Sequence, residues 1–147
     1  MQQSDWENPF CEDWVEALER TLLGMTTETV LAAHSLGCLL VAHWAAKTRI
    51  GAKGALLVAP PDPEGPNYPK QAVGFSPLPL KRLAFPSIVV ASANDPYGTL
   101  SFAQRIAAAW GSGFVNIGAV GHINADSGLG DWPEGLSLLR RLAHEKI

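Results

Sequence analysis

The segment at residues 52–59, with the sequence AKGALLVA, most constrains the fold, because it is short and almost wholly apolar. A continuous apolar run of this length is typical of a strand that is covered on both faces, as in a parallel sheet. Further strand-like runs at 29–33, 87–92 and 114–117 alternate with helical patterns at 12–23, 36–48, 99–110 and 134–145. This alternation predicts an α/β fold of three layers, in which a mostly parallel sheet lies between helices.

The helical patterns carry apolar residues at helical spacing. The helix at 36–48 is almost wholly apolar, which indicates burial against the sheet, and we interpret its His43 as a packed core residue rather than a ligand. Gly24 is placed to end the first helix. The apolar faces expected of the first and last helices are Trp14, Leu18 and Leu22, and Leu136, Leu139 and Leu142.

Length and composition indicate one domain, residues 1–147, of an ordinary globular kind. The chain is 47% hydrophobic and 17% charged, with a formal net charge of −3. It has no basic stripe, so nucleic acid is not an expected partner. No apolar run approaches the roughly 20 residues of a membrane span, and the first residues do not resemble a signal peptide. We therefore expect a cytoplasmic protein that does not bind membranes.

The two cysteines do not have the spacing of a metal site or a disulfide framework. Cys11 is expected in a loop and Cys38 at the start of a helix, both as free thiols in a reducing compartment. No metal and no cofactor are expected.

The stretch 60–86 contains eight of the eleven prolines, which predicts one long loop. A loop of this length is either functional or disordered. Its apolar part, residues 75–80, could line a pocket lid or could be ordinary loop packing.

Residues 30–38, VLAAHSLGC, have the form of a nucleophile elbow, in which a serine lies on a tight turn between a strand and a helix. The elbow pattern G-x-S-x-G needs small flanking residues, and here Ala33 replaces the first glycine while Gly37 is the second. The alternative interpretation of Ser35 is an ordinary helix N-cap.

Ser35, Asp95 and His122 each follow a different predicted strand, so all three are expected at the carboxyl edge of the sheet. Their order, Ser, Asp, His, is the order of the triad in α/β-hydrolases. In such a triad the imidazole accepts the serine proton, the carboxylate orients the imidazole, and the N–H of the next residue, here Leu36, donates to the oxyanion. Taken singly, Asp95 could be a turn residue before proline and His122 a surface histidine.

Other ionisable residues fit the triad less well. Asp126 and Asp131 come after His122 in the chain and do not follow a strand. We expect His34, beside the serine, to point elsewhere on the tight turn, and His144 to lie on the last helix.

Five segments of the chain form a set of motifs: AAAWGSGF at 107–114, GHINADSGLGDWPEG at 121–135, DWENP at 5–9, DWV at 13–15 and HSLG at 34–37. Together they resemble the motifs of small serine hydrolases of the retinoblastoma-binding protein 9 and YdeN type. The resemblance spans nearly the whole chain. It implies an α/β-hydrolase fold, the triad Ser35, Asp95 and His122, and hydrolysis of small carboxylic esters.

One departure from that family concerns the amino terminus. Members begin with an earlier strand and a Gly-rich loop that contributes to the oxyanion hole, and neither has a counterpart here. We therefore expect an amino-terminally truncated hydrolase domain, read from an internal methionine, with an unpaired edge on strand 29–33 and reduced turnover. The alternatives are a non-catalytic interaction module of the same fold and a thioesterase or acyltransferase. The sequence does not indicate the natural substrate or the oligomeric state.

Overall fold

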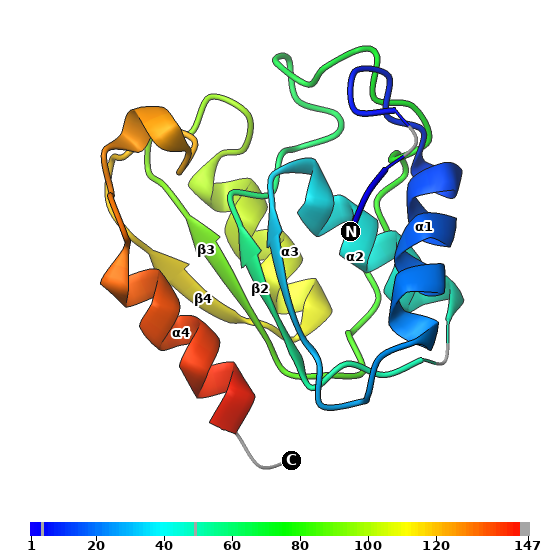
Figure 1. Ribbon diagram of the computed structural model, residues 1–147. Helices are drawn as coiled ribbons and strands as arrows, with labels where there is room; N and C mark the ends of the chain where they lie inside the picture. The colour runs from blue at the N-terminus through cyan, green and yellow to red at the C-terminus, as the bar shows by residue number, and fades with distance from the viewer. Residues whose placement is uncertain (4, 49, 145–147) are drawn as a thin grey trace.

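The computed structural model describes residues 1–3, 5–48 and 50–144, and consists of a four-stranded sheet between two layers of helices (Figure 1). The strands are β1 (Val30–His34), β2 (Gly54–Val58), β3 (Ser87–Ala91) and β4 (Gly113–Asn116). The helices are α1 (Cys11–Leu23), α2 (Leu36–Lys47), α3 (Leu100–Trp110) and α4 (Pro133–His144), with a 3₁₀ turn at Ala125–Ser127. The three-layer α/β prediction is confirmed.

The strands lie in the order β1-β2-β3-β4, and every neighbouring pair is parallel. The connections run through α2, the loop 60–86 and α3. Because all four strands point the same way, the loops that follow them gather at one edge of the sheet. The chain therefore brings Ser35, Asp95 and His122 to that edge.

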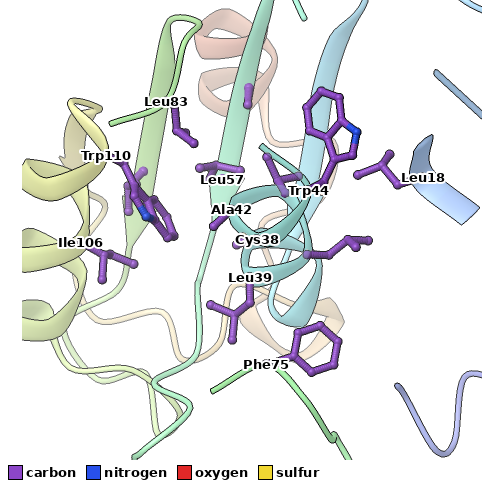
Figure 2. Close-up of a cluster of buried hydrophobic side chains, with 14 of the residues drawn as sticks. Leu18, Cys38, Leu39, Ala42, Trp44, Leu57, Phe75, Leu83, Ile106 and Trp110 are labelled. Carbon is purple, nitrogen blue, oxygen red and sulfur yellow. The ribbon is translucent and has the colours of Figure 1, made fainter. Parts of the chain in front are cut away.

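The two faces of the sheet bury different helices, which explains the continuous apolar runs. Leu57 and Val89 face the layer of α1, α2 and α3, where Trp44 and Trp110 are almost fully buried (Figure 2). The alternate strand residues Leu56, Val58, Ile88 and Val90 face α4 and pack with its Leu142. Successive strand side chains point to opposite faces, so strands covered on both sides must be apolar at every position.

Most predicted helices and strands agree with the structure to within one or two residues, with two corrections. Cys11 is the first residue of α1 rather than a loop residue.

Leu136 is 44% exposed, and the buried face of α4 is formed by Leu138, Leu139 and Leu142. At about 100° per residue, Leu138 lies roughly 40° from Leu142 around the helix axis, whereas Leu136 lies roughly 120° away. The predicted end of this helix at Glu145 lies outside the described residues.

The loop 60–86 contains no helix or strand and packs against the α2 layer. Phe75 is fully buried, with its ring edge-on to those of Trp14 and His43. The Nε2 of His43 donates to the carbonyl of Phe75 at 2.9 Å, which confirms His43 as a packed core histidine. Phe75 thus fills the core and does not line a lid, so loop packing is the correct interpretation for this residue.

Candidate active site

Ser35 occupies a strained turn between β1 and α2. Its φ of 54° and ψ of −125° are unfavourable for a residue with a Cβ, and its N–H donates to the carbonyl of Val58 in β2 at 2.9 Å. Such a conformation persists only where the surroundings fix it, and it is typical of functional sites. Ser35 occupies the N-cap position of α2, but its side chain makes no capping hydrogen bond there, so it does not act as an ordinary helix cap.

Small residues lie on both sides of this turn. A Cβ placed on Gly37 would lie 3.5 Å from the Cβ of Ala33, which is an ordinary van der Waals contact, so the turn would accept an alanine at position 37 without a clash. The thiol of Cys38 is fully buried and donates to the carbonyl of Val58 at 3.3 Å. Burial raises the pKa of Cys38, so this thiol stays protonated and serves as a structural donor.

Asp95 lies in the loop after β3 and is oriented by its own turn. Its Oδ1 accepts a hydrogen bond from the N–H of Tyr97 at 2.9 Å, and its side chain is only 2% exposed. Both carboxylate oxygens contact Nδ1 of His122, at 3.0 and 2.9 Å. The acid that contacts His122 is therefore Asp95, and not Asp126 or Asp131.

His122 reaches Ser35 from the far side of the sheet. The strands β4 and β1 are three spacings apart, or about 14 Å, so the loop after β4 must turn back across β3 and β2. Gly121, at φ 68°, provides a left-handed conformation directly before the histidine. Nε2 of His122 lies 2.8 Å from Oγ of Ser35, so the structure brings together all three residues singled out in the sequence.

Two polar residues of the Asp95 loop, neither of them among the residues predicted for the site, hold the His122 loop. Ser92 is fully buried; its Oγ accepts the N–H of Val120 at 3.0 Å and donates to Oδ1 of Asn94 at 3.0 Å. The same Asn94 oxygen accepts the N–H of Gly121 at 2.7 Å. The sequence signal was a serine at the end of an apolar strand, because a buried hydroxyl there requires a partner.

The expectation for His34 was wrong. Its ring packs against that of His122 with centroids 4.8 Å apart, and its Nε2 lies 2.9 Å from the carbonyl oxygen of His122. The ring of Tyr97 also packs against the imidazole of His122, with the ring centroids 4.6 Å apart. The His122 side chain, 12% exposed, is thus flanked by two aromatic rings.

A cavity of about 260 Å³ lies at Ser35 and His122. The rest of its lining includes Leu36, Tyr97 and Asn124, with Pro61 and Pro69 from the loop 60–86. This loop therefore does contribute to the site, but through Pro61 and Pro69 rather than through residues 75–80. An apolar groove of about 460 Å³ runs from Ser35 along β1 toward α1.

No group of three or more His, Cys, Asp and Glu side chains in residues 1–3, 5–48 and 50–144 could hold a metal ion. Within the same residues, no helix has the length and hydropathy needed to cross a membrane.

The chain belongs to the serine hydrolase family. The family model described as "Serine hydrolase" matches residues 1–141. A YdeN-like hydrolase from Pectobacterium atrosepticum is 33% identical, with a TM-score of 0.82 over 97% of this chain and 74% of that chain. No curated protein matches the chain significantly.

More distant solved structures share the fold. The ydeN gene product of Bacillus subtilis is 21% identical, with a TM-score of 0.80 over 99% of this chain and 81% of that chain. A carboxylesterase from Bacillus cereus is 16% identical, with a TM-score of 0.60 over 90% of this chain and 59% of that chain. The α/β-hydrolase fold is therefore confirmed, while the resemblance to retinoblastoma-binding protein 9 stays a prediction.

Proposed function

We propose that the chain is a serine esterase that hydrolyses small carboxylic esters through an acyl-enzyme on Ser35. The observation that carries the proposal is the continuous chain of contacts from Asp95 to His122 Nδ1, and from His122 Nε2 to Ser35 Oγ at 2.8 Å. The strained turn at Ser35 adds support, because it presents the hydroxyl to the imidazole rather than to α2.

The first half of the reaction acylates the serine. His122 Nε2 takes the Ser35 proton as Oγ attacks the ester carbonyl carbon, and a tetrahedral oxyanion forms. When this intermediate collapses, the bond to the alcohol oxygen breaks, and the imidazolium returns the proton to the leaving alkoxide. The Asp95 carboxylate holds the Nδ1 proton and stabilises the imidazolium through both steps.

The second half releases the acid. A water gives a proton to His122 Nε2 and attacks the acyl carbon, and Oγ leaves as the proton returns to it. Leu36 is assigned as an oxyanion donor in both halves. It is the first residue of α2, and the first N–H groups of a helix have no partner within the helix.

Two spaces reach Ser35, and the smaller one, which is lined by both Ser35 and His122, supports a small substrate. Ligand pockets usually measure about 300–1,000 Å³, and the cavity of about 260 Å³ at Ser35 lies just below this range. Its proline and tyrosine lining suits a short apolar acyl or alkyl group.

The test combines covalent labelling with turnover. The protein is treated with a fluorophosphonate, its intact mass is measured, and hydrolysis of p-nitrophenyl acetate and of a long-chain p-nitrophenyl ester is followed. We expect one phosphonate per chain, loss of labelling and turnover in Ser35→Ala, and preference for the short ester. Ser137→Ala, a control on the exposed face of α4, should behave as the unmodified protein.

Two results would contradict the proposal that the chain is a serine esterase. Folded protein without Ser35-dependent labelling would support a non-catalytic protein of this fold. Labelling at Ser35, with turnover of acyl thioesters but not of oxygen esters, would instead support a thioesterase.

A further inference from the structure

His34 links the strand that carries the nucleophile to the loop that carries the imidazole. It is the last residue of β1, adjacent to Ser35, and it is 88 positions from His122 in the chain. Its Nε2 lies 2.9 Å from the carbonyl oxygen of His122, and the two rings pack at 4.8 Å.

The chemistry of this contact fixes the role of His34. A carbonyl oxygen only accepts, so Nε2 of His34 must carry a proton and donate. The neutral Nε2–H tautomer and the imidazolium both satisfy this requirement. His34 therefore serves as a donor in either charge state, and its Nε2 is occupied and does not act as a base.

The contact completes the support of the His122 loop. Ser92 and Asn94 hold this loop from the Asp95 side, at the amides of Val120 and Gly121. The second of these hydrogen bonds is at Gly121, one residue before His122. On the Ser35 side, His34 forms a hydrogen bond with the backbone of His122 itself.

We propose that His34 is a positioning residue, whose hydrogen bond to the His122 carbonyl keeps Nε2 of His122 within reach of Ser35 Oγ. The inference rests on the proposed function, because the positioned group is the proposed general base. A displacement of about 1 Å at a reacting group can cost a large factor in rate. His34 is itself exposed, so its replacement opens no cavity in the core.

The test uses variants that separate donation from packing. His34→Gln keeps a donor at nearly the same distance, His34→Met has similar length and no donor, and His34→Phe keeps a ring without a donor. His144→Met, at an exposed position near the end of α4, is the control. We expect kcat for p-nitrophenyl acetate to fall roughly 3- to 10-fold in the Met and Phe variants at unchanged KM, the effect of one hydrogen bond. The Gln variant and the control should stay near the unmodified value.

A second measurement does not depend on turnover. The imidazole proton between His122 Nδ1 and Asp95 is followed by proton NMR, and we expect it to be sharp in the unmodified protein and His34→Gln, and broadened in His34→Met. If the unmodified protein has no Ser35-dependent turnover, the esterase is rejected, and the NMR signal still decides the role of His34. Unchanged kcat and an unchanged signal in His34→Met, or equal losses in the Gln and Met variants, would overturn the proposal.

Discussion

The carboxylate of Asp95 contacts Nδ1 of His122 with both oxygens, at 3.0 and 2.9 Å, while Oδ1 also accepts the N–H of Tyr97. A carboxylate can only accept, so Nδ1 carries a proton and the lone pair of neutral His122 is on Nε2. This nitrogen is the one that lies 2.8 Å from Ser35 Oγ. The position of the acid thus sets which imidazole nitrogen is available as a base.

Asp95→Asn should therefore lower kcat by about 10⁴-fold with little change in fold, because an amide can donate to Nδ1 and favour the wrong tautomer. The measurement is p-nitrophenyl acetate turnover, with urea unfolding as the check on folding. Asp126→Asn and Asp131→Asn are matched controls and should keep most of the activity. A comparable loss in either control would contradict the assignment of Asp95.

Ser92→Ala should lower both stability and turnover. The buried hydroxyl accepts the N–H of Val120, and its removal leaves that amide without its partner, at a cost of about 1–3 kcal/mol in the free energy of unfolding. Because Val120 is two residues before His122, kcat should fall as well.

Ser87→Ala is the matched control at the other end of β3, where the hydroxyl bonds to Ser112. It should lower the free energy of unfolding and leave kcat per folded molecule unchanged. The measurements are urea unfolding and kcat, made on both Ser92→Ala and Ser87→Ala. Equal kcat in the two variants would show that the bond from Val120 to Ser92 does not position His122.

The sequence was enough to predict the sheet and the residues at its edge, for a definite physical reason. Strands such as β2 and β3 are buried on both faces, so their apolar runs are continuous and easily located. Parallel strands then bring every following loop to one edge, which predicts the proximity of Ser35, Asp95 and His122 without any knowledge of loop geometry.

The contacts of His34, Ser92 and Asn94 could not be predicted in this way. They depend on the path of the loop after β4, which no periodic pattern encodes. The burial of Phe75 in the core could not be predicted either, because a proline-rich loop has no repeating pattern of buried residues. The error at Leu136 was different, since a leucine-rich helix offers more than one possible apolar stripe, and packing against the sheet selects one of them.

Because its thiols are buried, the protein is expected to have a lower free energy of unfolding in alkaline solution. Burial raises the pKa of Cys11 to about 11 from an ordinary value of 9.0. Between these values the unfolded chain has lost the proton and the native chain has kept it, so the free energy of unfolding falls as the pH rises. Below the unfolded pKa the contribution is fully present.

Urea unfolding of the unmodified protein and of Cys11→Ala, between about pH 8 and pH 11, measures this effect. The variant should show the weaker dependence on pH, whatever its absolute stability. Identical slopes would show that Cys11 is not shielded from solvent in the native protein.

The edge of β1 that faces away from β2 is expected to make the protein self-associate. The carbonyl of Thr29 and the N–H of Ser35 both bond to the β2 side, so the alternate residues Val30, Ala32 and His34 point their backbone groups away from it. Among the described residues no strand pairs with this edge, and the groove beside it is lined without a single charged side chain. Exposed apolar edges of this kind favour pairing with another strand, and natural proteins often block them with lysine.

Ala32→Lys should accordingly reduce association, because the exposed Ala32 lies on β1 beside the groove. Sedimentation velocity over a wide concentration range is the measurement. The sedimentation coefficient of the unmodified protein should rise with concentration, whereas that of Ala32→Lys should stay nearly constant. Ser101→Lys, on the exposed face of α3, adds the same charge away from the edge and should associate like the unmodified protein. A monomeric unmodified protein at all concentrations, or equal suppression by both lysines, would show that the β1 edge does not drive association.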